Sequence, residues 1–509
     1  MQDPSTQEPF VPGNGHSVDR RTFLRTTAVG IGTVAASSAI AYGEEAAKNA
    51  KANEHKEGAG ATSKPVDPSK LIWRSKSPDM EYVRLGSTNF MVSRIVAGLG
   101  GGAKEADLLR RSLQRGVNYF DTARGYGSSE VEFKPFLKEY GKDLWVVSKA
   151  TDIAGYSRID QDVRKLYIEA MKKYLGDAEI AKLEGQAGSH AADKEKSKAQ
   201  LDLLLLHNAA VAKEKASGEK PDLRPIGKLM AEMYLKKLDE SLERMGIDCV
   251  DSYFMHGIEI PWFFDCHEVW EAYEKAHKAG KVKHFGFSVH NHHKEVLAAA
   301  VGAIKKGPWK IDLIMPGVNP VSFDNLKPEL AALKKLDVGI VAMKTNGLKN
   351  RKVDGNDKRF ETLMANEKYG EYERSKLWML NMTDGLIDAV ICQMQNMEQL
   401  EKNIPLASVK LSAQALRELD AIVKLEMAGA CHLCGDCQTH CPEHIALVDM
   451  LRYHAYVHQY DEKDMARALY EQAGYDPAKL CSNCGTCSDV CKSRVPIVNL
   501  LHELSRDMA

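Results

Sequence analysis

Two matched runs of cysteine near the end of the 509-residue chain restrict its folding more than any other feature. Both runs have the spacing C-x2-C-x2-C-x3-C, and a proline follows the first. The positions are Cys431, Cys434, Cys437 and Cys441 in the first run, and Cys481, Cys484, Cys487 and Cys491 in the second. Such short gaps bring three thiolates onto one iron–sulfur cubane, while the fourth cysteine binds the other cubane. The runs therefore predict two [4Fe–4S] clusters, which store and pass single electrons.

A zinc ribbon is the other structure that clustered cysteines form. Zinc sites use four ligands in paired C-x2-C units, whereas each run here supplies four cysteines by itself. The clusters are therefore the favoured interpretation. The apolar residues between the two runs suit helices. Residues 429–509 are predicted to form a small, mostly α-helical ferredoxin-type iron–sulfur domain.

The N-terminal segment has the pattern of an export signal. Arg20 and Arg21 precede a weakly hydrophobic stretch, and residues 39–41 form a small-x-small cleavage site. This segment resembles a twin-arginine signal, whose route carries folded, cofactor-loaded proteins, so clusters and export are compatible. We expect residues 1–41 to be a signal peptide and the mature protein to be periplasmic, without a stable membrane span. A retained membrane anchor is the alternative.

Charge and composition exclude some partners. Residues 42–78 are low in hydrophobicity and are predicted to be a disordered linker. The whole chain has 69 basic and 70 acidic residues, whereas a nucleic-acid partner would require a basic excess or stripe. We therefore expect no nucleic acid to bind.

Between residues 79 and 428, short apolar runs alternate with helical patterns. The expected strands are 95–99, 118–121, 144–149, 250–256, 284–288, 313–315, 339–344 and 389–393. Eight such units predict an α/β fold, the (β/α)8 or TIM barrel, whose chemistry lies at the C-terminal ends of its strands. Asp121, Lys149, His256 and Ser288 all fall at such ends.

A charged segment at about 152–225 interrupts the barrel pattern. We expect it to be a helical lid or partner surface above the barrel mouth. The run 201–207 ends in His207 and is a rival for the strand that leads to the active histidine. His207 lacks the preceding Ser-Leu-Glu-Arg helix, so we interpret it as part of the insertion.

Several motifs of the barrel resemble those of the aldo/keto reductases. Segment 80–93 is similar to their opening hairpin, 118–130 to their second-strand signature, and 238–256 to the helix and strand before their active histidine. Segment 279–288 continues the match, and the cysteine-rich tail resembles one that a branch of the family carries. The resemblance implies an oxidoreductase that acts on a carbonyl or alcohol.

The resemblance also implies a catalytic tetrad, which falls on Asp121, Tyr126, Lys149 and His256. A carbonyl that is reduced needs a proton on its oxygen, and a tyrosine with its usual pKa near 10 exchanges protons slowly at neutral pH. We expect Lys149 to lower the pKa of Tyr126, and Asp121 to hold Lys149 in its charged form. His256 would orient the carbonyl or share the proton relay.

The cofactor residues implied by the resemblance are Ser288, Asn291, Asn319, Lys344 and Asn403. Other positions depart from the family pattern. Met315 and Val318 replace the glutamine and the aromatic residue that hold the nicotinamide, and Gln399 replaces the basic residue for the 2′-phosphate. The sequence therefore leaves open whether the barrel binds NAD(P), a flavin or neither of them.

Two functions follow from these patterns. The first is an exported oxidoreductase with a small carbonyl or alcohol substrate, coupled through two [4Fe–4S] clusters to a redox protein partner. The alternative is an electron-transfer or binding module whose barrel is catalytically degenerate.

Overall fold

The computed structural model describes residues 66–100, 106–154, 159–186, 206–207, 209–348, 358–365, 367–443 and 445–509. The expected signal peptide, most of the linker and part of the insertion lie outside these residues. Among the described residues, no helix is long and apolar enough to cross a membrane.

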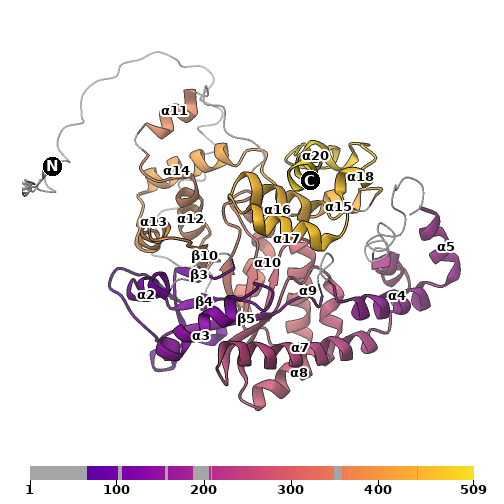
Figure 1. The fold of residues 1–509 in the computed structure, drawn as a ribbon, viewed down its shortest axis with the longest axis horizontal. Helices are drawn as coiled ribbons and strands as arrows, with labels where there is room; N and C mark the ends of the chain where they lie inside the picture. Colours follow the sequence, from indigo (N-terminus) through magenta and orange to yellow (C-terminus); the bar gives the residue numbers. More distant parts are fainter. Residues whose placement is uncertain are drawn as a thin grey trace, which may run out of the picture. The chain divides into compact units, whose positions relative to one another are not determined.

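A closed barrel of eight parallel strands forms the centre of the described chain (Figure 1). The strands are β3 (Ile95–Gly98), β4 (Tyr119–Asp121), β5 (Trp145–Ala150), β6 (Val250–Met255), β7 (Val282–Val289), β8 (Leu313–Pro316), β9 (Gly339–Ala342) and β10 (Ala389–Gln393). Each pairs with the next along the chain, and β10 pairs with both β9 and β3, which closes the ring. All eight predicted strands and the predicted barrel are thereby confirmed.

Helices follow the strands and surround the barrel. Those of the barrel are α2 (Ala106–Gln114), α3 (Ser129–Tyr140), α7 (Arg224–Met245), α8 (His267–Lys278), α9 (His293–Lys306), α10 (Phe323–Lys335), α11 (Lys358–Met364), α12 (Glu371–Asn381), α13 (Met397–Asn403) and α14 (Ala413–Glu426). Short 3-10 helices are η1 (Pro68–Lys70), η2 (Gly86–Thr88), η3 (Gly141–Asp143), η4 (Pro261–Asp265) and η5 (Ile404–Ser408). Because helices cover the outside and side chains fill the inside, most strand residues are buried on both faces.

A hairpin of β1 (Tyr82–Arg84) and β2 (Met91–Ser93) precedes the barrel, as the motif resemblance implied. It contributes Phe90, which stacks on Trp145 of β5 with 4.6 Å between ring centroids. Both side chains belong to a buried cluster inside the barrel. The hairpin therefore plugs the N-terminal end of the barrel, and chemistry is left to the other end.

The expected insertion begins after β5. Its described part contains α4 (Gln161–Leu175) and α5 (Asp177–Gln186), which agrees with the expected helical character. His207 lies on a short helical stretch, and 201–205 lie outside the described residues. His207 is therefore not at the end of a barrel strand.

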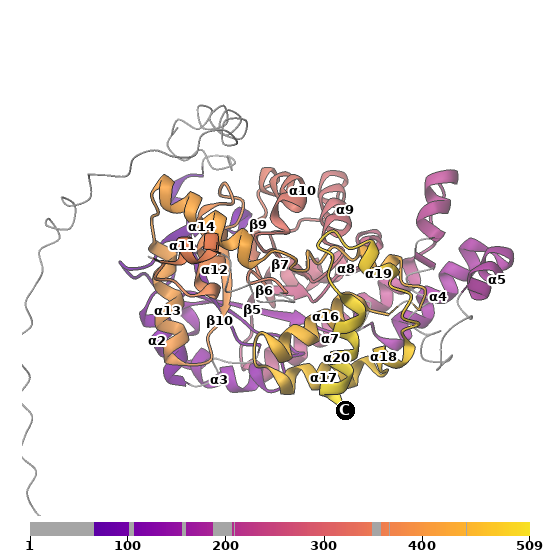
Figure 2. The same cartoon turned by 90° about the horizontal axis from the view of Figure 1, so that it is seen from above.

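The cysteine runs belong to a helical C-terminal domain with a hydrophobic core of its own. Its helices gather in one group, coloured yellow in Figures 1 and 2. They are α15 (Asp436–Thr439), α16 (Leu447–His458), α17 (Lys463–Ala473), α18 (Pro477–Leu480), α19 (Thr486–Asp489) and α20 (Ile497–Met508).

The predicted disorder of the linker is wrong for its last residues, 66–78, which pack on the barrel. The guanidinium of Arg74 donates two hydrogen bonds of 2.8 Å to Asp251 of β6. Asp251 also accepts hydrogen bonds from Val146 N at 3.0 Å and Lys283 Nζ at 2.8 Å. This buried carboxylate therefore joins the starts of β5, β6 and β7 to the segment before the barrel.

We expect Asp251→Asn to lower the free energy of unfolding by about 3 kcal/mol at pH 7, because it leaves a largely buried guanidinium without its partner. Burial alone would raise the pKa of Asp251, but the hydrogen bonds and charge of Arg74, with Lys283, bring it below 3.8. The stabilisation is therefore present above the unfolded pKa and is lost as the pH falls through the folded one.

Urea unfolding of wild type and variant, compared at pH 7 and near pH 3, measures this difference. The matched control is Asp239→Asn, which breaks an exposed ion pair with Lys281 and should cost less than about 1 kcal/mol. Equal losses in the two variants would contradict the assignment.

Candidate functional site

The four tetrad residues lie at one end of the barrel. Asp121 ends β4, Lys149 lies next to the end of β5, and His256 follows β6 directly. Tyr126 lies in the loop between β4 and α3. Parallel strands of a barrel end at the same face, so these loops carry their side chains to a common site.

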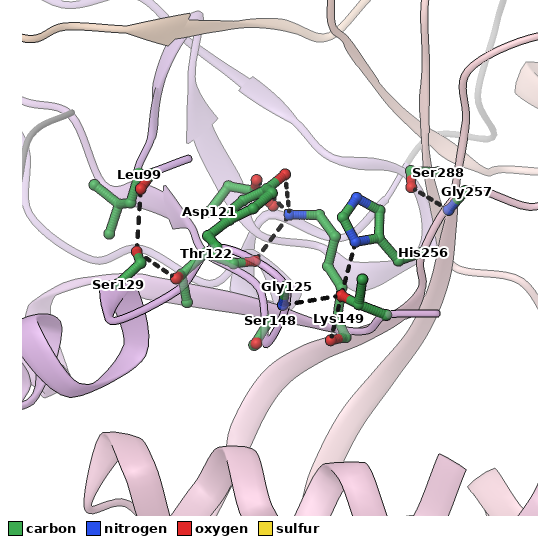
Figure 3. A network of polar contacts seen from close by, with 12 residues as sticks. Leu99, Asp121, Thr122, Gly125, Ser129, Ser148, Lys149, His256, Gly257 and Ser288 are labelled. Atoms are coloured by element: carbon green, nitrogen blue, oxygen red, sulfur yellow. Dashed lines mark hydrogen bonds and ion pairs between the residues drawn. The ribbon is translucent and has the colours of Figure 1, made fainter. Parts of the chain in front are cut away.

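Lys149 is the centre of this arrangement (Figure 3). Its Nζ donates to Asp121 Oδ2 at 2.5 Å, to the Thr122 carbonyl oxygen at 2.8 Å and to Tyr126 Oη at 3.4 Å. Lys149 and Asp121 are both buried. An ammonium has three donors, so this set occupies all of them and fixes Lys149 beneath Tyr126.

His256 is held from its Nδ1, which lies 2.9 Å from Thr151 Oγ1. Its ring meets that of Tyr126 edge to face, with 5.6 Å between the centroids. The following residue, Gly257, donates its N–H to Ser288 Oγ at 2.9 Å (Figure 3). These contacts keep the imidazole beside the phenol.

Burial controls the electrostatics of Tyr126. Its ring is partly exposed, but protein surrounds the hydroxyl, and this desolvation raises its pKa above 10. Lys149 acts in the opposite direction by a smaller amount. Lys149 therefore lowers the pKa of Tyr126, as expected, but burial outweighs this contribution and the net shift is upward.

The charges of Lys149 and Asp121 depend on each other. Burial alone would lower the pKa of Lys149, but Asp121 and Tyr126 raise it above 10.5, so the amine keeps its charge as predicted. Burial raises the pKa of Asp121, and Lys149 counteracts this effect. A buried ion pair of this kind is maintained only while both partners are present.

The cofactor residues implied by the resemblance occupy four segments that follow successive strands. We name the segments 288–291, 315–319, 344–348 and 393–403, after β7, β8, β9 and β10, the dinucleotide strip. Ser288 is engaged by Gly257, as described above.

Two asparagines of the strip have buried amide atoms without a hydrogen-bond partner among the described residues. Both side-chain polar atoms of Asn291 are in this state, as is Nδ2 of Asn319. Asn319 Oδ1 accepts from the N–H groups of Val321 and Ser322, both at 3.1 Å. Buried amides are normally satisfied, so these atoms indicate a place for a polar ligand group.

In the segments after β9 and β10, the expected cofactor residues Lys344 and Asn403 have contacts within the protein. Asn403 Nδ2 donates back to the Gln399 carbonyl of its own helix at 2.7 Å. Lys344 has its Nζ 5.9 Å from the ring centroid of Tyr456 in α16. The structure thus places Lys344 beside the C-terminal domain.

The two cysteine runs adopt the same loop twice. Leu433 and Asn483 have positive φ values of 58° and 57°, and Gly435 and Gly485 have 83° and 79°. The N–H groups of Leu433 and Asn483 both lie 3.4 Å from the sulfur two residues earlier. A short helix follows each loop, which makes the two runs a structural repeat.

The eight cysteines divide into two sets that mix the runs. In the first set, Cys431 and Cys437 have Cys434 and Cys491 as electrostatic neighbours, and Cys487 of the second set acts on Cys437 more weakly. The second set comprises Cys441, Cys481, Cys484 and Cys487, which line one cavity. The fourth cysteine of each run therefore lies with the other run, as the spacing predicted.

No group of three or more histidine, cysteine, aspartate or glutamate side chains within the described residues is placed to hold a single metal ion. Burial raises the pKa of Cys431 to about 12 and that of Cys441 to about 11. Cys484 is exposed, and Thr486 lowers its pKa. The buried thiols are therefore neutral near pH 7 unless a positive centre favours the thiolate.

Sequence reasoning missed the contacts of His256 with Thr151 and of Lys344 with Tyr456. The Lys-x-Thr order at the end of β5 offers no signal for the first, since threonine is common in strands. Helical periodicity identifies the apolar face of α16 and not its partner in the barrel. Both contacts join segments that are distant in the sequence.

The comparisons agree with this geometry. Residues 224–424, from α7 to α14, match the model of the aldo/keto reductase family. This part of the barrel is therefore similar to the aldo/keto reductases, a family of oxidoreductases. The motifs at 238–256 and 279–288 lie within the matched residues.

Individual relatives match more weakly. The aldo-keto reductase yakc [NADP(+)] of Schizosaccharomyces pombe is 31% identical over 101 residues, which is 19% of this chain. The match spans 26% of the length of that relative, about a quarter. Among solved structures, the holo form of aldo-keto reductase AKR11C1 from Bacillus halodurans has 16% identity, a TM-score of 0.43 and coverage of 68% of this chain and 97% of that chain. An aldo/keto reductase from Brucella melitensis has 17% identity, a TM-score of 0.42 and coverage of 68% and 99%.

Proposed function

We propose that the chain is an exported oxidoreductase whose aldo/keto reductase barrel interconverts a small carbonyl and its alcohol. Two [4Fe–4S] clusters in the C-terminal domain exchange electrons with a redox protein partner. The observation that carries the proposal is the buried network of Asp121, Lys149 and Tyr126 beside His256. It joins a proton donor to a fixed positive charge at the active end of the barrel.

Tyr126 has the properties of the proton donor for carbonyl reduction. Conversion of a carbonyl to an alcohol takes up two electrons and two protons, of which Tyr126 would supply the proton to oxygen and solvent water the proton to carbon. With a pKa above 10, the phenol holds its proton at neutral pH and can donate it to the developing alkoxide. The phenolate left behind lies 3.4 Å from Lys149 Nζ, which stabilises its charge, and Asp121 keeps Lys149 in place.

His256 is suited to position the carbonyl oxygen. Thr151 fixes the ring plane through Nδ1, and the edge-to-face contact sets its distance from Tyr126. A carbonyl bound between the two rings would have its oxygen within reach of the phenol. The buried amides of Asn291 and Asn319 could bind a polar group of the substrate or of a cofactor.

The family's dinucleotide fits this chain only in part. Asn291 and Asn319 suit a carboxamide, but Lys344 lies against the C-terminal domain. Met315 and Val318, which replace the family's nicotinamide contacts, are both buried in hydrophobic clusters. We therefore assign no hydride step to a nicotinamide, and a flavin remains an alternative for the same place.

The two cysteine sets suit [4Fe–4S] clusters. Cys431, Cys434, Cys437 and Cys491 would hold one, and Cys441, Cys481, Cys484 and Cys487 the other. When bound, the clusters supply single electrons, and two of them match the two electrons of carbonyl reduction. Each thiolate of a cubane binds a different iron, so four such thiolates stand farther apart than the ligands of a single ion. Backbone N–H groups that point at sulfur, such as that of Val495 toward Cys491 at 3.4 Å, favour the thiolate.

Export is supported by the sequence alone. Arg20 and Arg21 and the small-residue segment after them suit the twin-arginine route to the periplasm. This route would carry the protein with its clusters already inserted.

A second function is favoured by the buried Met315 and Val318. If the barrel lacks its own electron donor and substrate, the chain is an electron-transfer or binding module. The two functions differ in whether Tyr126 matters for turnover.

We expect Tyr126→Phe to reduce carbonyl turnover by about 100-fold or more, since the phenol supplies the proton. Turnover is measured with a chemically reduced one-electron dye and a panel of small aldehydes and ketones. In wild type the rate should show no basic limb below about pH 10, because the pKa of Tyr126 is raised and the proton is lost only above it.

The matched control is Tyr140→Phe, at the end of α3 and away from Lys149, which should retain wild-type turnover. Equal activity of Tyr126→Phe and wild type, or no turnover by wild type on any carbonyl, would favour the electron-transfer module.

Cysteine variants test the division into sets. Cys437→Ala and Cys491→Ala, from different runs but the same set, should each lose about half of the iron and the same paramagnetic signal of the reduced protein. Cys441→Ala should lose the other signal. Cys249→Ala, outside both sets, should retain all the iron. If substitution of Cys437 and of Cys441, which are in the same run, removed the same signal, the mixed sets would be refuted. Zinc in place of iron in the purified protein would refute the clusters.

A further inference from the structure

The C-terminal domain contacts the dinucleotide strip at three places. The first is at the ends of β7 and β8. His293 Nδ1 lies 3.2 Å from the Leu433 carbonyl oxygen, and Leu433 is fully buried. A methyl group placed on Gly317 would lie 3.4 Å from Leu433 Cδ1. The loop of the first cysteine run therefore rests on the strip next to Asn291 and Asn319.

The second place is the segment after β9. Cys431 forms an antiparallel bridge with Leu348, and its N–H donates to the Leu348 carbonyl at 3.0 Å. Tyr460, between α16 and α17, donates its hydroxyl to the Gly347 carbonyl at 2.7 Å. With the ring of Tyr456 over Lys344, the segment is covered by side chains and backbone of the C-terminal domain.

The third place lies after β10 and on α12. Gln395 donates a side-chain hydrogen bond to Glu462 at the start of α17. Tyr372 of α12 donates its hydroxyl to the Gln459 carbonyl and stacks on Tyr460, with 5.8 Å between centroids and an interplanar angle of 25°. Contacts thus extend along the whole strip, from the segments with Asn291 and Asn319 to the segment after β10.

We propose that the C-terminal domain, through the turn between α16 and α17, is the resident occupant of the dinucleotide strip, and that NAD(P)H binds only when this turn is displaced. The proposal rests on the proposed function in one respect, the partial fit of a dinucleotide to the strip at Asn291 and Asn319. The Gly347 carbonyl, the face of Lys344 and the Gln395 amide are engaged by the domain, so an extended dinucleotide cannot use them at the same time.

Competition of this kind has a quantitative signature. If docking must be undone before NADPH binds, the apparent Kd is the intrinsic Kd multiplied by one plus the docking constant. When the docking constant is much larger than one, a variant that lowers it by a given factor lowers the apparent Kd for NADPH by the same factor. One hydrogen bond between neutral groups is worth about a factor of five.

Tyr460→Phe tests the competition, because it removes the hydroxyl that binds Gly347 and keeps the ring that stacks on Tyr372. NADPH affinity of the full chain is measured anaerobically by calorimetry. We expect about fivefold tighter binding in Tyr460→Phe, and about 25-fold in the double variant Tyr372→Phe/Tyr460→Phe. The matched control is Tyr470→Phe of α17, whose hydroxyl points to Ser505 within the domain and whose loss should leave affinity unchanged.

Hydrogen exchange provides a second readout. Saturating NADPH should increase exchange in α16 and α17 of the Tyr460→Phe protein while leaving β3–β10 protected. Tight, equal NADPH affinity in wild type and variants would overturn the proposal, because the strip would then be accessible in the docked protein. Absence of NADPH binding in every variant would overturn it as well.

These outcomes are separable from those of the proposed function. NADPH binding can be measured in a protein that does not turn over. If Tyr460→Phe binds NADPH more tightly but the protein reduces no carbonyl, the competition is supported and the carbonyl chemistry is contradicted. Full turnover with unchanged NADPH affinity in the variants would support the carbonyl chemistry and contradict the competition.

Discussion

The buried ion pair between Lys149 and Asp121 is the interaction on which the rest of the site depends. Neither charge could be accommodated inside the barrel alone, and together they fix a cation beneath Tyr126. The barrel contributes the required geometry, since β4 and β5 are neighbours whose C-terminal ends meet. At the opposite end of the barrel, Asp251 joins the starts of neighbouring strands through its hydrogen bonds. The two buried carboxylates thus act at opposite ends of β5.

The barrel and the mixed cysteine sets could be predicted from the sequence because both follow from local patterns. A strand buried on both faces is a short apolar run, and a cubane loop has fixed cysteine spacing. The lowering effect of Lys149 on the pKa of Tyr126 could be predicted, but the net upward shift could not, because it depends on how much protein surrounds the hydroxyl. The contacts of Tyr456 and Tyr460 with the barrel could not be predicted either, since no periodic pattern identifies a partner more than a hundred residues away.

The C-terminal domain and the barrel form a shared site rather than two separate ones. The loop of Leu433 touches the ends of β7 and β8, and Tyr456 lies over Lys344. The departures from the family pattern at Met315 and Val318 lie within this shared region. Buried apolar residues at the positions where the resemblance would place nicotinamide contacts are consistent with a tail that covers the same segments. Electron supply and substrate binding would then be properties of the interface.

The mixed cysteine sets have a consequence for how the domain is made. Cys437 belongs with Cys491, and Cys441 belongs with the second run, so neither run completes a set by itself. If the sets hold clusters, as we propose, neither cluster has all its ligands until the residues after α17 and α18 have been synthesised. The two clusters would then be completed together at the end of synthesis, and not one cysteine run at a time.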